Sequence, residues 1–218
     1  MVIPIESSPP PGWDAGGIDL LLGQFPQGHL SEIVGPWSSG SSSLLVGLLA
    51  RATATGRLVA LVDTGDAFDP ASAVAAGADL GTLLWVRCGG RLKAAFSAAD
   101  LLARCPGLAM VALDLGELPP TRRHPAPPAA YLRLQRAVEG TATVLVLRTP
   151  HRLAGSVARL VVSVRGVNAC WVGRARPTRL AGLRSQAQVL RSSARAVSPR
   201  CCPSEGGSLG EWTIEWRL

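Results

Sequence analysis

Eight residues near the start of the chain have the types and spacing of a phosphate-binding loop. They are Gly35, Pro36, Trp37, Ser38, Ser39, Gly40, Ser41 and Ser42. The run fits GxxxxGK[ST], whose backbone amides and helix N-terminus cradle phosphate, except that Ser41 stands where the motif has lysine. A hydrogen bond from a charged group contributes roughly 1.5–3 kcal/mol, so its loss lowers nucleotide affinity about ten- to a hundredfold. We therefore expect a structural strand-to-helix turn; residual binding of nucleotide or sulfate through the amides is the alternative.

Two further residues could complete such a site. Ser42 could supply the hydroxyl that binds magnesium in this motif. Asp114 ends an apolar segment and is expected to be the Walker B-like carboxylate. Lys93 is the only lysine in the chain, so it is the only internal replacement for the missing one.

The elements that would position these residues alternate regularly along the first 150 residues. Short apolar runs predict strands, and longer runs with apolar residues three or four apart predict helices. The expected strands are 30–34, 58–62, 83–86, 108–113 and 143–147, and the expected helices are 42–53, 70–77, 92–104 and 129–138. Continuous apolar strands separated by helices are typical of an α/β fold with a mostly parallel sheet covered on both faces.

The pattern changes after Pro150. Residues 157–164, 169–173, 186–196 and 212–218 read as strands without helices between them, which predicts an antiparallel C-terminal extension of the sheet. The last strand places Trp212 and Trp216 on one face, where they either cap the core or bind a partner. We expect residues 1–17, rich in proline and glycine, to be a flexible lead-in, and residues 18–218 to form one domain whose part from 150 is antiparallel and arginine-rich.

The amino-acid composition narrows the classes of protein to which the chain could belong. Of the 218 residues, 47% are hydrophobic and 17% charged, as in a globular protein. No apolar run approaches the roughly 18 residues of a membrane span, and no secretory signal is recognisable, so we expect a cytoplasmic protein near the nucleoid. The five cysteines are expected to be reduced, and no histidine or cysteine spacing indicates a metal site.

The charge is concentrated in the C-terminal part. Residues 1–120 carry a net −5 and residues 121–218 a net +12. The candidate partner-binding residues are Arg174, Arg176, Arg179, Arg184, Arg191 and Arg195, together with Trp212 and Trp216. A solvated face, an acidic partner surface and weak contact with the DNA backbone remain alternative interpretations of these arginines.

Residues 28–88 carry a resemblance to a known family. The segment runs from GHLSEIVGPWSSGSSSLL through Asp69-Pro70 to GADLGTLLWVRC. It resembles the nucleotide-binding core of the RecA recombinases, and especially their short relatives, the ImuA proteins of bacterial mutagenesis cassettes. Weaker similarity extends the match to about residues 18–170. The resemblance implies a RecA-like P-loop core.

Most of the catalytic set implied by the resemblance is missing. The acidic general base should stand two residues after Asp63, where the chain has Gly65, and Asp66 follows one position late. The aromatic residue that stacks on adenine is replaced by Ser72. The sensor glutamine is absent, and its neighbourhood reads Arg148-Thr149-Pro150. General base catalysis alone contributes roughly 10²–10⁴ in rate, so we expect no ATP turnover and no cofactor.

The segments with which RecA proteins form filaments and grip DNA are also reduced. Three consecutive prolines in residues 1–17 are incompatible with the N-terminal helix that docks on a neighbouring subunit. The loop after Asp114 is short and proline-rich, and few residues separate Leu147 from Ser156.

The resemblance to ImuA therefore implies an inactive adaptor in DNA-damage-induced (SOS) mutagenesis. It would link RecA to ImuB, an inactive Y-family polymerase subunit, and through ImuB to an error-prone DnaE-type polymerase for translesion synthesis. Two alternatives stay open: an ATPase completed in trans by a partner or by Lys93, and a division inhibitor of the SulA type.

Overall fold

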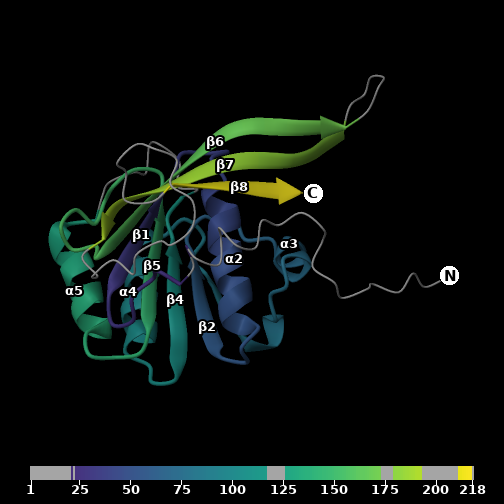
Figure 1. The fold of residues 1–218 in the computed structure, drawn as a ribbon. Coiled ribbons are helices and arrows are strands. Elements are labelled where there is room, and N and C mark those ends of the chain that lie inside the picture. Colours follow the sequence, from purple (N-terminus) through teal and green to yellow (C-terminus); the bar gives the residue numbers. More distant parts are fainter. Residues whose placement is uncertain (1–20, 22, 117–125, 173–178, 193–210, 218) are drawn as a thin grey trace.

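A single mixed sheet forms the centre of the fold. The computed structural model describes residue 21 and residues 23–116, 126–172, 179–192 and 211–217 (Figure 1). The strand order is β3-β2-β4-β5-β1-β6-β7-β8. The strands are β1 (Leu30–Val34), β2 (Leu58–Asp63), β3 (Leu83–Arg87), β4 (Leu108–Asp114), β5 (Val144–Thr149), β6 (Leu160–Val172), β7 (Arg179–Ser192) and β8 (Glu211–Arg217).

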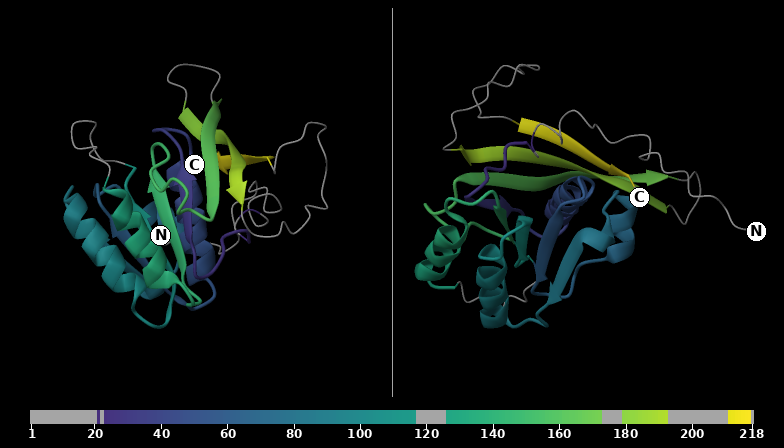
Figure 2. Two further views of the ribbon diagram at one scale, coloured as in Figure 1. Left: turned by 90° about the vertical axis from the view of Figure 1, so that its left-hand side faces the viewer. Right: turned by 90° about the horizontal axis from the view of Figure 1, so that it is seen from below.

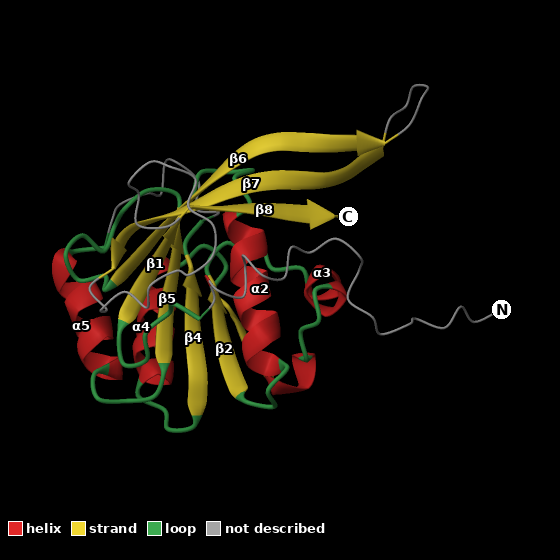
Figure 3. Cartoon of the chain, viewed as in Figure 1, coloured by secondary structure: helices red, strands yellow, loops and turns green. Residues whose placement is uncertain are grey.

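Helices cover both faces of the sheet, as the alternation of elements predicts (Figure 3). The helices are α2 (Ser41–Thr53), α3 (Pro70–Ala75), α4 (Leu92–Ala103) and α5 (Pro128–Val138), with a short 3₁₀ turn at Leu80–Thr82. Leucines of α2 belong to one hydrophobic core, and α4 and α5 belong to a second core on the other face. Figure 2 shows the same layers from two further directions. The α/β class with a mostly parallel sheet is confirmed.

The parallel strands form where the sequence is continuously apolar. All five residues of β1 are buried, and in β2 only Leu58 is exposed. On α4 the buried stripe consists largely of Ala95, Ala99 and Ala103. Such small side chains let the helix axis lie close to the sheet.

Residue types after Pro150 led to wrong strand boundaries and one wrong direction: the strand expected at 186–196 is β7, Arg179–Ser192. The expected strands 157–164 and 169–173 are one continuous strand, β6, which runs parallel to β1 and antiparallel only to β7. The polar interruption at Arg165-Gly166-Val167-Asn168 is absorbed by a register shift between Gly166 and Asn168. An extra residue in one strand lets the ladder continue beyond a break in the apolar pattern. The antiparallel extension therefore consists of β7 and β8.

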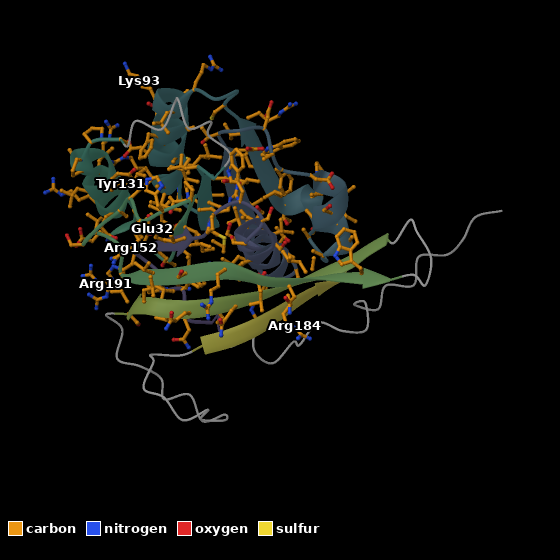
Figure 4. All side chains as sticks on the ribbon, turned by 90° about the horizontal axis from the view of Figure 1, so that it is seen from above. Glu32, Lys93, Tyr131, Arg152, Arg184 and Arg191 are labelled. Carbon is orange, nitrogen blue, oxygen red and sulfur yellow. The ribbon has the colours of Figure 1, made fainter. Side chains whose placement is uncertain are left out.

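A buried carboxylate fixes the segment that crosses from β5 to β6. Glu32 of β1 is fully buried, and its Oε1 accepts hydrogen bonds from the backbone N–H of Leu153 (2.7 Å) and Ala154 (3.2 Å) and from the Thr149 hydroxyl (3.1 Å). Glu32 and the neighbouring Tyr131 lie inside the domain (Figure 4). The crossing segment is thus tied to the centre of the sheet without a helix of its own.

The C-terminal strands extend past the helical layers (Figure 1). β6 and β7 form a long hairpin, and β8 pairs with β7 from Gly182 to Gln188. The side chains of β8 lie outside the described residues, so the expectation for Trp212 and Trp216 is not tested. Within the described part of the chain, no helix has the length and apolar character needed to cross a membrane.

Candidate functional site

The phosphate-loop residues connect β1 to α2, as the spacing predicts. Gly40 adopts φ 89°, a left-handed conformation that suits glycine, and the helix begins at Ser41. A Cβ on Gly35 would lie 2.4 Å from Ser39 Oγ and 2.9 Å from the Val164 carbonyl oxygen. The loop therefore needs glycine at both ends.

Two of the loop amides are used inside the loop. The N–H of Ser41 donates to Ser39 Oγ at 3.2 Å, and the N–H of Ser39 donates to the Pro36 carbonyl at 3.2 Å. Ser39 is buried, so its hydroxyl lies within the turn. These bonds engage the two amides with one side chain and one backbone carbonyl of the loop itself.

The guanidinium of Arg148 lies between the two groups that would hold magnesium in this motif. Arg148 is in β5 and pairs in the sheet with Asp114 of β4. Its Nε donates to Asp114 Oδ1 at 2.7 Å, and its Nη1 donates to Ser42 Oγ at 2.5 Å. The residue is only 3% exposed, so this contact is made away from solvent. As they stand, Asp114 and Ser42 do not fit a metal ion, because a protein cation already engages both.

Gly116 makes room for this arginine. A Cβ at Gly116 would lie 2.3 Å from the Arg148 Cζ, closer than any real Cβ contact. The N–H of Gly116 also donates to Asp114 Oδ1 at 2.9 Å. The same carboxylate oxygen thus accepts one charged and one neutral hydrogen bond.

Burial dominates the electrostatics of Asp114. Loss of solvent raises the pKa of its carboxyl above the usual range, and the charge and hydrogen bond of Arg148 oppose that rise. A buried carboxylate with a hydrogen-bonded guanidinium is tolerated, whereas either group alone would be costly. The Asp114–Arg148 pair therefore contributes to the stability of the fold as well as to the geometry of the site.

Trp37 fastens the loop to the segment that follows β4. Its indole Nε1 donates to the Gly116 carbonyl at 3.0 Å, yet 55% of the residue remains exposed. A Cβ on Gly166 would lie 2.8 Å from the Ser38 carbonyl oxygen, so β6 also approaches the loop closely. The loop is held from two sides, and an aromatic ring remains exposed on its surface.

The carboxylates at the end of β2 and just after it have structural roles. Asp63 is buried and accepts hydrogen bonds from the N–H groups of Ala67 and Phe68 and from Trp85 Nε1. Asp66, at φ 61°, forms an exposed two-bond ion pair with Arg87, at 2.7 and 2.8 Å. The hydrogen bond from Arg87 lowers the pKa of Asp66. Asp66 is thus engaged at β3, on the edge of the sheet, rather than at the loop.

Ser72 and Lys93, the two other positions considered for the nucleotide site, lie away from the loop. Ser72 donates its hydroxyl to Asp69, which caps the N-terminus of α3. Lys93 is in the first turn of α4, which follows β3. Three strands separate β3 from β1, which places them roughly 19 Å apart at about 4.8 Å per strand. The structure does not bring Lys93 to the loop.

Only part of the arginine set is described. Arg184 is exposed, and Arg191 Nη1 donates to the Gly155 carbonyl at 3.4 Å. Arg191 lies at one end of β7 and Arg184 nearer its middle (Figure 4). The side chains of Arg174, Arg176, Arg179, Arg195, Trp212 and Trp216 lie outside the described residues. In the described part of the chain, no three His, Cys, Asp or Glu side chains gather as a metal site would need.

Arg148 is the site residue whose role sequence reasoning missed. It lies in the neighbourhood where the resemblance to RecA proteins implies a sensor glutamine, and from the sequence alone only its place just after an expected strand could be inferred. A signal was present nevertheless. An arginine and an aspartate ending adjacent buried strands, in a chain without the loop lysine, indicate a charge pair.

Comparisons with known proteins identify the family of the chain. Residues 10–120 match the sequence profile described as the RecA N-terminal domain, just over half of the chain. Protein RecA of Corynebacterium urealyticum is 36% identical over 111 residues, which is 51% of this chain and 30% of that protein. Protein RecA of Methylococcus capsulatus is 38% identical over 105 residues, 48% of this chain and 30% of that protein. The matched region thus spans under a third of the length of these relatives.

Proposed function

Since the chain belongs to the RecA N-terminal domain family, we propose that it works as a RecA-like binding protein that does not hydrolyse ATP. The observation that carries this proposal is the Arg148 guanidinium, which occupies the carboxylate and hydroxyl that would otherwise hold magnesium. Phosphoryl transfer depends on positioned cations and a positioned nucleophile. Here the loop lysine is replaced by Ser41, and Asp66 is paired with Arg87.

For the biological setting we propose an adaptor of the ImuA type in DNA-damage-induced mutagenesis and repair. The adaptor would connect the recombinase RecA with the polymerase subunit ImuB, and through ImuB with a DnaE-type polymerase. The similarity to RecA supports a partner that recognises RecA-like surfaces. The exposed Trp37 residue, which belongs to the phosphate-loop segment, supports that face as the contact, because tryptophan is enriched among the residues that dominate binding energy.

Calorimetry tests the absence of nucleotide binding. ATP with magnesium is titrated into the purified chain alone and then into its mixture with RecA, with RecA alone as the positive control. We expect no saturable heat from the chain alone and a binding signal between the chain and RecA. Saturable binding of ATP at micromolar concentrations would contradict the first part of the proposal, and stimulation of hydrolysis by a partner would favour an ATPase completed in trans.

A pair of tryptophan variants tests the proposed RecA contact. Trp37→Ala should weaken RecA binding about tenfold or more, as truncation of a central aromatic does. Trp171→Ala is the matched control, because Trp171 is 61% exposed on the β6–β7 hairpin. Equal RecA binding by both variants and by the unchanged chain would reject the loop face as the contact.

The contact with ImuB is tested separately on the C-terminal strands. Replacing Arg191 and Arg195 together by alanine should weaken retention of ImuB in a pull-down and leave RecA binding unchanged. Unchanged ImuB retention would reject the arginine assignment. Binding to the tubulin homologue FtsZ without affinity for RecA would instead favour the division-inhibitor alternative.

A further inference from the structure

A groove of about 550 Å³ runs between α4 and α5, on the face of the sheet opposite α2. Its apolar lining comes from both helices and from the residues just before α5: Leu92, Phe96, Ala126, Pro127, Ala130 and Leu134. The Phe96 ring packs edge-on against Tyr131, with centroids 5.4 Å apart, so the groove wall is held in place by the core. The groove is a preformed apolar surface.

An ion-pair cluster closes one side of the groove. Asp100 of α4 pairs with Arg104 at 2.9 Å and with Arg133 of α5 at 2.7 Å. Hydrogen bonds from Arg133 and Arg104 lower the pKa of Asp100 to about 2, so the cluster persists at neutral pH. One carboxylate shared by two guanidiniums leaves one positive charge, and the arginine side chains are 68% and 53% exposed.

Lys93 adds a second positive charge to the rim. It lines the groove, is exposed, and has no ion-pair partner among the described residues. It projects at the outer edge of the molecule, away from the β6–β7 hairpin (Figure 4). Lys93 and the ion-pair cluster beside the groove thus contribute three cationic side chains and one carboxylate, a net positive charge that an acidic partner would complement.

One exposed apolar side chain, Leu101, lies past the groove along α4. Lys93, Ser97 and Leu101 stand four residues apart and therefore share one stripe of the helix. Leu101 is 67% exposed. A ligand confined to the groove would leave Leu101 uncovered, whereas a helix laid along α4 would cover both the groove and Leu101.

We propose that this groove docks an acidic amphipathic helix of a partner protein. Its apolar side chains would enter between Phe96 and Leu134, and its carboxylates would meet Lys93 and the Arg104–Arg133 pair. A helix that presents anchors three, four and seven residues apart is a common occupant of a two-helix groove. This docking is independent of the nucleotide loop and of the RecA contact proposed above, so each can fail without the other.

The probe is a fluorescein-labelled helical peptide of about four turns, with leucines on one face and glutamates elsewhere. A matched peptide has lysine for every glutamate. Fluorescence anisotropy with the full chain should show the glutamate peptide binding roughly tenfold more tightly than the lysine peptide. Similar affinity for both peptides, or saturation by neither, would overturn the proposal.

The single lysine allows the site to be located directly. Reductive methylation with ¹³C-formaldehyde keeps the charge and labels only the amines of Lys93 and the N-terminus. The Lys93 methyl signal should shift with the same saturation curve as the anisotropy. Saturable binding that leaves this signal unmoved would place the peptide elsewhere and reject the groove.

Surface variants complete the test. Lys93→Glu should weaken the glutamate peptide about five- to tenfold and strengthen the lysine peptide. Ala129→Phe places a large ring in the groove from an exposed lining position and should abolish binding. Arg57→Glu is the matched charge control on the turn between α2 and β2 and should change binding less than about twofold. Equal effects of Lys93→Glu and Arg57→Glu would show a response to overall charge and overturn the docking site.

Discussion

Replacing Arg148 by methionine should destabilise the fold by about 3 kcal/mol or more, because it leaves a buried carboxylate without its cation. Methionine keeps much of the side-chain volume, so the loss reports charge and hydrogen bonding rather than a large cavity. Among the described residues, Asp114 Oδ1 would keep the N–H of Gly116 alone, and the Ser42 hydroxyl would lose its charged donor. Breaking a buried pair from one side typically costs about 3–5 kcal/mol, which sets the expected size.

Urea unfolding followed by circular dichroism gives the free energy, and a thermal melt gives an independent value. For a domain of about 200 residues, 3 kcal/mol corresponds to a fall in Tm of roughly 6–12 °C. Arg87→Met is the control, since it removes an arginine from an equally short two-bond pair with Asp66 that is exposed to solvent. The control should leave the Tm nearly unchanged, because water screens exposed pairs.

The stability of Arg148→Met should also acquire a distinctive pH dependence. Burial already raises the pKa of Asp114, and removal of Arg148 takes away the groups that oppose the rise. A carboxyl whose folded pKa exceeds its unfolded value binds protons more tightly in the folded state, so stability falls as pH rises through the unfolded value of about 4. The destabilisation of Arg148→Met should therefore be smaller below pH about 4 than at pH 7.

The double variant Asp114→Asn/Arg148→Met measures the interaction between the two charges separately from their other contacts. Removing both charges should recover a large share of the stability lost by Arg148→Met alone, because no uncompensated charge remains. A loss below about 1 kcal/mol for Arg148→Met, or no coupling between the two positions, would refute the placement of the guanidinium between Asp114 and Ser42.

Three other variants test neighbouring parts of the structure. Gly116→Ala should destabilise by about 1–3 kcal/mol in urea unfolding, because its Cβ would displace the Arg148 guanidinium. Glu32→Ala should cost about 3 kcal/mol or more in the same assay, since it leaves buried amides of the crossing segment without acceptors, whereas exposed Glu139→Ala should be neutral. Asp100→Asn should flatten the acid limb: the folded pKa of about 2 lies below the unfolded value of about 4, so the ion pairs stabilise the unchanged protein above pH about 4 and are lost toward pH about 2. Identical acid limbs for both proteins would contradict the role of Asp100.

The sheet was predictable because β1, β2, β4 and β5 are buried almost throughout. Continuous apolar runs such as 58–62 and 143–147 give position and direction together when helices connect them. β6 was predicted less well, because Arg165 and Asn168 interrupt its apolar pattern near a register shift. Sequence periodicity reports which side chains are buried, and it does not report whether the backbone ladder continues through a bulge.

The loop was predictable as a turn, whereas the groups that fill it were not. Gly35 and Gly40 mark the strand-to-helix turn by their spacing alone. The Arg148 contact depends on the register of β4 against β5 and on the space left at Gly116. Both are set by the tertiary structure and cannot be inferred from residue spacing. The ion pair between Asp66 and Arg87 likewise joins a turn to a strand distant in sequence.

The position of Arg148 determines whether the stability of the region around Asp114 depends on dissolved cations. A dissolved ion that binds the folded state contributes a stabilisation that rises with its concentration. A side chain tethered to the backbone has a fixed effective concentration at its partner. The positive charge facing Asp114 is therefore present in every copy of the chain at any level of free magnesium, and chelation of that ion should leave the melting curve unmoved.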